Sequence, residues 1–137
     1  MLVAAALNDE VDHPQALAFL DAAASGLIAV MAADLARIEL AAAVLRAARR
    51  GRLAQETVPV VVAVMDGAPI TWVPSAPYAT IAVEFASSRG TSLYDALPAM
   101  LARRHGLVLV STDRRLMSAL RSTQAVVEPG EAIRSLT

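Results

Sequence analysis

Three acidic side chains lie close behind sequence stretches expected to form buried strands or to open helices. Asp113 follows the apolar run 107–110 after two residues, Glu39 lies in the helix pattern after residues 27–30, and Asp95 lies near the start of another helix pattern. Two carboxylates about 4 Å apart repel by about 4 kcal/mol at an effective dielectric constant of about 20, and a cation would relieve that repulsion. Ligand sets made only of oxygen select hard ions such as Mg²⁺ or Mn²⁺, which activate water and shield a phosphodiester. If the three acids converge, they predict metal-dependent hydrolysis.

Each acid also has a structural interpretation. Asp113 is the residue type that caps a helix start, and Asp95 stands three residues after Ser92, as in a capping box. Glu39 falls within the expected apolar stripe of its helix, where a buried carboxylate without a partner is costly. Both interpretations stay open from the sequence.

The basic residues are all arginine, twelve in number, and the chain has no lysine. This excludes a P-loop nucleotide site and Schiff-base chemistry. Arg46 and Arg50 lie seven and eleven residues after Glu39, on one helix face, with Arg49 beside them. They predict a track for phosphate groups, although arginines near a helix C-terminus also favour the helix dipole.

Arg114 and Arg115 occupy the first turn of a predicted helix, where cations oppose the dipole. Residues that break a local stability rule beside a candidate site favour a functional role over a structural one. We therefore predict that both arginines belong to the candidate site.

The composition is that of one globular domain over residues 1–137, with 56% hydrophobic residues and a net charge of -1. The absence of cysteine excludes disulfides and thiolate metal sites and indicates a reducing, cytoplasmic location. Apolar runs such as 58–65 are shorter than the roughly 20 residues that a membrane span needs. We expect neither a secretory signal nor a membrane location.

Hydrophobic periodicity predicts helices alternating with short apolar strands. The longest helix follows Asp34 as its N-cap, carries the apolar stripe Leu35, Ile38, Ala42 and Leu45, and ends before Gly51. This alternation is typical of an α/β fold with a parallel sheet covered on both faces, and ligands bind such sheets beyond the carboxyl ends of the strands. The expected helices span residues 14–25, 35–50, 77–88, 92–105 and 113–120, and the strands 27–30, 70–73, 107–110 and 125–127. Residues 58–65 are ambiguous, because their valines favour a strand while Thr57 followed by Pro59 resembles a helix start, and we favour a helix.

Two segments, Ser-Leu-Tyr-Asp-Ala-Leu at 92–97 and Leu-Val-Leu-Val-Ser-Thr-Asp-Arg-Arg-Leu at 107–116, resemble the PIN-domain ribonucleases, especially VapC-type toxins. Residues 38–40 and 49–53 share the resemblance. It implies a three-layer α/β/α sandwich, an Mg²⁺ or Mn²⁺ site with Glu39, Asp95 and Asp113 as catalytic ligands, and endonucleolytic RNA cleavage. It also implies a homodimer and a cognate antitoxin that blocks the site.

The start of the chain departs from the family pattern. The family opens with a central strand that ends in an aspartate, whereas residues 1–7 look like the helix that follows it. We expect a Val-rich strand ending in aspartate to be encoded upstream. The alternative is a non-catalytic PIN-like module that binds RNA or an antitoxin. A third interpretation, a small-ligand doubly wound domain, would need a Gly-rich phosphate loop, and the sequence has none.

Overall fold

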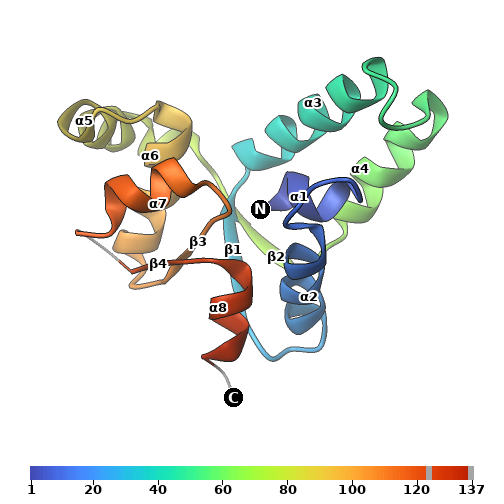
Figure 1. The fold of residues 1–137 in the computed structure, drawn as a ribbon. Helices are drawn as coiled ribbons and strands as arrows, with labels where there is room; N and C mark the ends of the chain where they lie inside the picture. Colours follow the sequence, from blue (N-terminus) through green and yellow to red (C-terminus); the bar gives the residue numbers. More distant parts are fainter. Residues whose placement is uncertain (123–124, 136–137) are drawn as a thin grey trace.

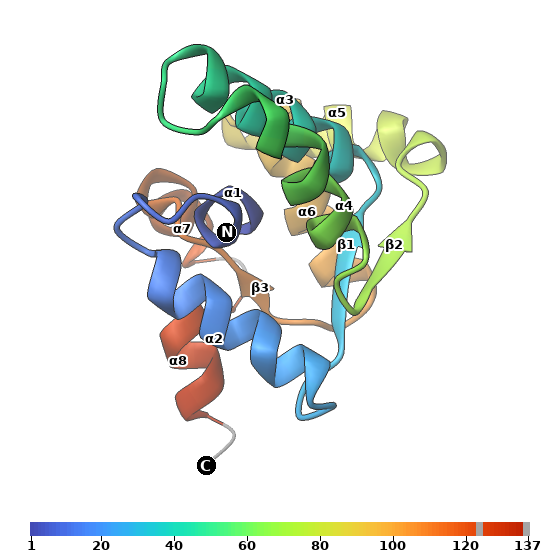
Figure 2. The same ribbon diagram turned by 90° about the vertical axis from the view of Figure 1, so that its right-hand side faces the viewer.

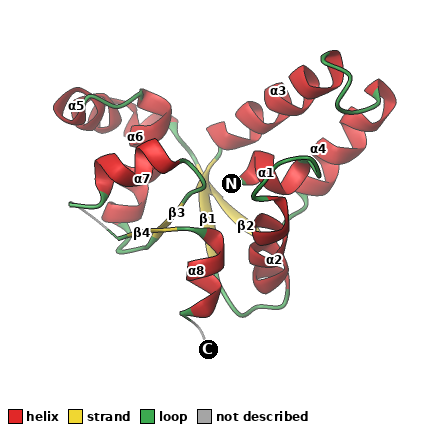
Figure 3. Cartoon of the chain, viewed as in Figure 1, coloured by secondary structure: helices red, strands yellow, loops and turns green. Residues whose placement is uncertain are grey.

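The computed structural model describes residues 1–122 and 125–135, and it places helices on both sides of short parallel strands. Helices α5 to α7 lie on one side and α1 to α4 on the other (Figures 1 and 3). This is the predicted three-layer α/β arrangement. The elements are α1 (Leu2–Ala6), α2 (His13–Ala24), β1 (Val30–Ala33), α3 (Leu35–Arg49), the 3₁₀ helix η1 (Gln55–Thr57), α4 (Val58–Asp66), β2 (Ile70–Val73), η2 (Ala76–Tyr78), α5 (Ala79–Arg89), α6 (Leu93–Arg104), β3 (Leu109–Val110), α7 (Arg114–Leu120), β4 (Val126–Val127) and α8 (Pro129–Arg134).

The strands form two separate parallel pairs. β1 pairs with β2, from Val30 opposite Ile70 to Ala33 opposite Val73. β3 pairs with β4, with Leu109 opposite Val126. Within the described residues no strand joins the two pairs.

Two strands begin later than the sequence predicts, and the reason is the same for both. Leu27 donates its N–H to the carbonyl of Ala22, and Leu107 donates to Ala102, each across a glycine with positive φ. These residues complete the C-terminal turn of the preceding helix and are not available for a strand. The first strand therefore spans residues 30–33 instead of 27–30, and the third spans 109–110 instead of 107–110.

Helix α3 turns a different face to the interior from the one predicted. Its buried residues are Leu40, Val44, Ala47 and Ala48, whereas Ile38 is 69% exposed. Helix α3 packs beside α4 and touches α1, so that only one side of it is covered (Figures 1 and 2). The predicted stripe through Leu35, Ile38, Ala42 and Leu45 was wrong, because alanine-rich sequence offers apolar residues on more than one face.

Three groups of buried residues make up the core. One joins α1, α2, α3 and β2, a second lies between β1, α5 and α6, and a third joins α6 and α7 to β3 and β4. The ambiguous segment at 58–65 forms helix α4, as favoured, with proline in its first turn. None of the described helices has the length and apolar character needed to cross a membrane.

Candidate functional site

Glu39 and Asp95 lie close enough for their charges to interact, although they belong to different helices. Glu39 is on α3, behind β1, and Asp95 is in the first turn of α6. Partial burial raises the pKa of the Glu39 carboxyl, and the negative charge of Asp95 raises it further. Glu39 is nevertheless an exposed residue, so the prediction that it points into the core was wrong. Two of the three predicted acids, Glu39 and Asp95, are thus within electrostatic reach of one another.

Asp95 is held in place by the start of its own helix. Its N–H donates to Oγ of Ser92 over 3.1 Å, and the Ser92 hydroxyl donates to Oδ2 of Asp95 over 2.7 Å. The predicted cap at Ser92 is therefore present, and it fixes the orientation of the Asp95 carboxylate. Capping and a functional role are compatible here, because this bond engages one carboxylate oxygen.

Asp113 caps helix α7, as its residue type predicts. Its Oδ1 accepts hydrogen bonds from the N–H groups of Arg115, over 2.8 Å, and Leu116, over 3.0 Å. The N–H of Asp113 donates to Oγ of the buried Ser111 over 3.0 Å. The cap uses one carboxylate oxygen, and the second lies outside it.

The charge of Asp113 acts on a residue that was not among the predicted site residues, the N-terminal Met1. The ammonium group of Met1 is largely buried, and this burial lowers its pKa, while the negative charges of Asp12, Asp113 and Glu10 act in the opposite direction. No motif signals this interaction, because it depends on where α1 is placed in the fold.

The three acids thus fall into a pair, Glu39 with Asp95, and a third member, Asp113, whose charge acts on Met1. Among residues 1–122 and 125–135, no group of three or more histidine, cysteine or acidic side chains is arranged to hold a metal ion. The pair fits part of a hard-cation site, because both ligands are oxygen and their repulsion would be relieved by a divalent ion. The three-carboxylate site stays a prediction.

A neighbouring acid, Asp34, has a structural role other than the predicted one. It occupies the N-cap position of α3 without capping the helix. Instead its Oδ1 accepts from the N–H of Ser75 over 2.9 Å and from the Ser75 hydroxyl, and the Ser75 Oγ in turn accepts from the N–H of Leu35. Asp34 therefore ties the end of β1 to the residues after β2.

The predicted RNA-binding arginines are all exposed. Arg46 and Arg49 lie in the last turn of α3, and Arg50 is its C-cap residue. Arg114 and Arg115 lie in the first turn of α7. Their exposure leaves them accessible to a phosphate chain.

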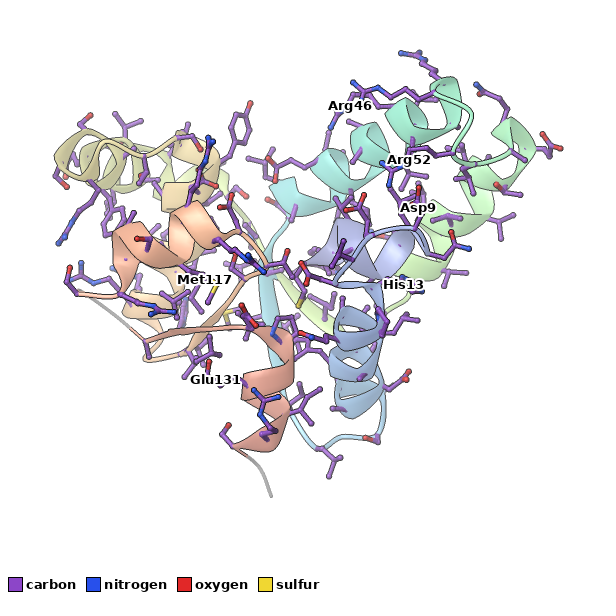
Figure 4. All side chains as sticks on the ribbon, in the orientation of Figure 1. Asp9, His13, Arg46, Arg52, Met117 and Glu131 are labelled. Atoms are coloured by element: carbon purple, nitrogen blue, oxygen red, sulfur yellow. The ribbon has the colours of Figure 1, made fainter. Side chains whose placement is uncertain are left out.

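Arg52 belongs to the same basic cluster in the sequence but behaves differently. It donates two hydrogen bonds of 2.7 Å to the carboxylate of Asp9, and it also pairs with Glu10. In Figure 4 the side chains of Arg52 and Asp9 point toward one another, whereas Arg46 lies on the outer part of α3. Arg52 is thus engaged in linking the α1–α2 connection to the end of α3.

An apolar groove of about 660 Å³ lies beside Glu39. It is lined by β1, β3, the N-terminal residues and one face of α6, and Glu39 and Tyr94 stand among its lining residues. No pattern in the sequence predicts this groove.

Comparison with known proteins agrees with this architecture. A sequence model of the PIN domain matches residues 1–121. The chain is also similar to a solved structure described as the crystal structure of PAE2754 from Pyrobaculum aerophilum, with 25% sequence identity and a TM-score of 0.64. That similarity covers 76% of this chain and 69% of the other. No curated protein matches the sequence.

Proposed function

The chain belongs to the PIN domain family, whose members are generally nucleases, and from this premise we propose that it is a metal-dependent endoribonuclease of the VapC toxin type. The observation that carries the proposal is the electrostatic interaction between Glu39 and Asp95 across two helices. An acid whose proton affinity is raised by partial burial and by a second carboxylate is expected at a cation site.

We propose that Glu39, Asp95 and Asp113 are the catalytic residues and hold Mg²⁺ or Mn²⁺. Such an ion, when bound, supplies an activated water and neutralises charge on the scissile phosphate. Ser92 orients the Asp95 carboxylate, and the α7 cap orients that of Asp113. Both acids are therefore pre-positioned by short local hydrogen bonds, which lowers the cost of ordering them around a ligand.

We propose that RNA is bound by Arg46, Arg49, Arg50, Arg114 and Arg115. Their planar guanidinium groups suit bidentate contacts with phosphate. A homodimer, a cognate antitoxin that blocks the site and a cytoplasmic location complete the proposal, and these three rest on the family resemblance.

A non-catalytic PIN-like module that binds RNA or an antitoxin is the second candidate. It is favoured by one observation, that no three-ligand group is assembled among the described residues. The two candidates share a fold and differ in whether bound RNA is cut.

A cleavage assay separates them. A mixed RNA pool is incubated with the protein and either Mg²⁺ or Mn²⁺, beside the variants Asp95→Asn and Asp113→Asn. Asparagine is also a good helix-capping residue, so Asp113→Asn removes the charge and keeps the cap. A matched control is Glu56→Gln, an exposed acid in η1 away from the proposed site.

The nuclease proposal expects metal-dependent cleavage that both asparagine variants lose and the Glu56→Gln protein retains. RNA binding without cleavage by the unchanged protein would support the binding module and contradict the nuclease.

A further inference from the structure

The rings of the aromatic residues differ in what covers them. The chain has five such residues, and all lie in the described ranges: Phe19, Trp72, Tyr78, Phe85 and Tyr94. Phe19 is 5% exposed and is part of the core. The next three are half-buried, and each has at least one arginine guanidinium over its ring, 5.3–5.8 Å from the ring centre. The pairs are Arg37 with Trp72, Arg104 with Tyr78, and both Arg89 and Arg103 with Phe85. These arginines are attracted to the rings and shield them from water.

Tyr94 is the exception among the five. Its side chain is 58% exposed, whereas the other four are buried or half-buried. Within residues 1–122 and 125–135, no arginine lies over its ring. Its flat apolar surface therefore stays in contact with water, which is unfavourable, and is free to contact a binding partner.

The position of this uncovered ring connects it to the pair of acids. Tyr94 lies in the first turn of α6, directly before Asp95, and it lines the same groove as Glu39. The hydrogen bonds between Ser92 and Asp95 close this turn, so they fix the backbone that carries both the ring and the carboxylate. The ring is thus held in a defined place beside the proposed cation site.

A ring next to acidic oxygen ligands suits one kind of substrate. The bound cation would hold a phosphate, and the ring would hold a planar group attached close to that phosphate. Single-stranded RNA has this chemistry, because its unpaired bases stack on aromatic side chains while its phosphates bind cations. Inorganic phosphate would make no use of the ring. In double-stranded RNA the base faces are already stacked inside the helix.

We propose that Tyr94 is a platform on which an unpaired base of RNA stacks, next to the phosphate held at the pair Glu39 and Asp95. This inference rests on the proposed function and adds to it a residue that binds the base. Every base has a flat face, so stacking tolerates different sequences. Tyr94 would therefore select unpaired RNA over paired RNA and discriminate little between bases.

The test detects stacking directly, with no need for cleavage. A short single-stranded RNA carries the fluorescent base 2-aminopurine at each position in turn, and its emission falls when that base stacks on a ring. Fluorescence and affinity are measured without divalent ions for the unchanged protein, Tyr94→Leu and Tyr94→Phe. The matched control is Tyr78→Leu, because Arg104 already covers that ring. The same RNA annealed to its complement gives the paired substrate.

The proposal expects quenching by the unchanged protein and by Tyr94→Phe, since both have a ring. Tyr94→Leu should lose the quenching and bind the single strand about tenfold more weakly, while its binding to the duplex and its melting temperature stay the same. Quenching that persists in Tyr94→Leu, or that Tyr78→Leu loses equally, would overturn the proposal.

Cleavage in Mg²⁺ is scored separately on the same RNAs. Cleavage without quenching at any position would overturn the role of Tyr94 and leave the nuclease standing. Quenching that depends on Tyr94, without cleavage, would support the stacking platform and contradict the nuclease.

Discussion

Glu39 on α3 is held within electrostatic reach of Asp95 on α6, although 56 positions separate them in the chain. The two acids come from the elements after β1 and at the start of α6, and neither helix alone would bring them together. The effect is visible in the raised pKa of Glu39, to which the charge of Asp95 contributes.

Neutralising Asp95 should lower the pKa of Glu39. In Asp95→Asn the negative charge that disfavours ionised Glu39 is removed, while burial, the larger cause of the shift, remains. The pKa should therefore move part of the way back toward 4.5, the ordinary value for glutamate. Carboxyl carbon NMR titration of Glu39 measures this. Glu56→Gln is the control, and an unchanged Glu39 titration in Asp95→Asn would refute the interaction.

The same pKa shift predicts how stability depends on pH. Because the folded-state pKa of Glu39 is raised above 4.5, the stability that protonated Glu39 contributes is present below that pH and is lost as the pH rises through the folded-state pKa. Glu39→Gln cannot ionise, so its stability relative to the unchanged protein should increase over this range. Urea unfolding at a series of pH values tests it. A stability difference that does not vary with pH would contradict the prediction.

Asp113 should show separate effects of charge and capping. Asp113→Ala removes the acceptor for the N–H groups of Arg115 and Leu116 and should lower the free energy of unfolding by about 1 kcal/mol. Asp113→Asn should lose much less, because the asparagine oxygen can still accept these bonds. Chemical denaturation compares the two variants. Equal losses would mean that the carboxylate charge, and not the cap, stabilises this end of α7.

The arginines near the end of α3 should differ in their effect on RNA. Arg46→Gln and Arg49→Gln should each weaken binding to a single-stranded RNA. Each should also reduce the magnitude of the slope of log affinity against log salt concentration, by about 0.7 for each phosphate that is no longer neutralised. Arg52→Gln is the matched control, because its guanidinium is already bound by Asp9 and Glu10. The RNA affinity of each variant, measured at several salt concentrations, tests this difference. An equal effect of all three substitutions would argue for general attraction without defined contacts.

The packing of the second strand pair should depend on Leu120, which is fully enclosed among residues of α6, α7 and β3. Leu120→Ala should cost about 3 kcal/mol, because it removes buried methyl groups and leaves a cavity. Val60→Ala on α4 is the control, since Val60 is 63% exposed and its truncation should change stability by less than about 0.5 kcal/mol. Thermal and urea unfolding of both variants measure the two losses of stability. Similar losses would show that Leu120 is not a core residue.

The order of helices and strands could be predicted from the sequence, because local signals determine it. Glycine ends α3, proline begins α4, and Ser92 and Asp113 cap α6 and α7 in the structure as their types predict. Helix capping and turn formation involve residues a few positions apart, so a single sequence contains the necessary information. The same locality explains why the acids could be singled out as candidates.

Several features depended on tertiary structure. They are the exposed face of α3, the electrostatic interaction of Glu39 with Asp95, the effect of the Asp113 charge on Met1, and the division of the strands into two pairs. An alanine-rich helix has several faces apolar enough to bury, and packing against α1 and α4 selects one of them. Charges meet across space only after the helices that carry them are packed. Whether a strand has a neighbour is likewise a property of the whole sheet, since hydrogen-bond partners in a parallel sheet are distant in the chain.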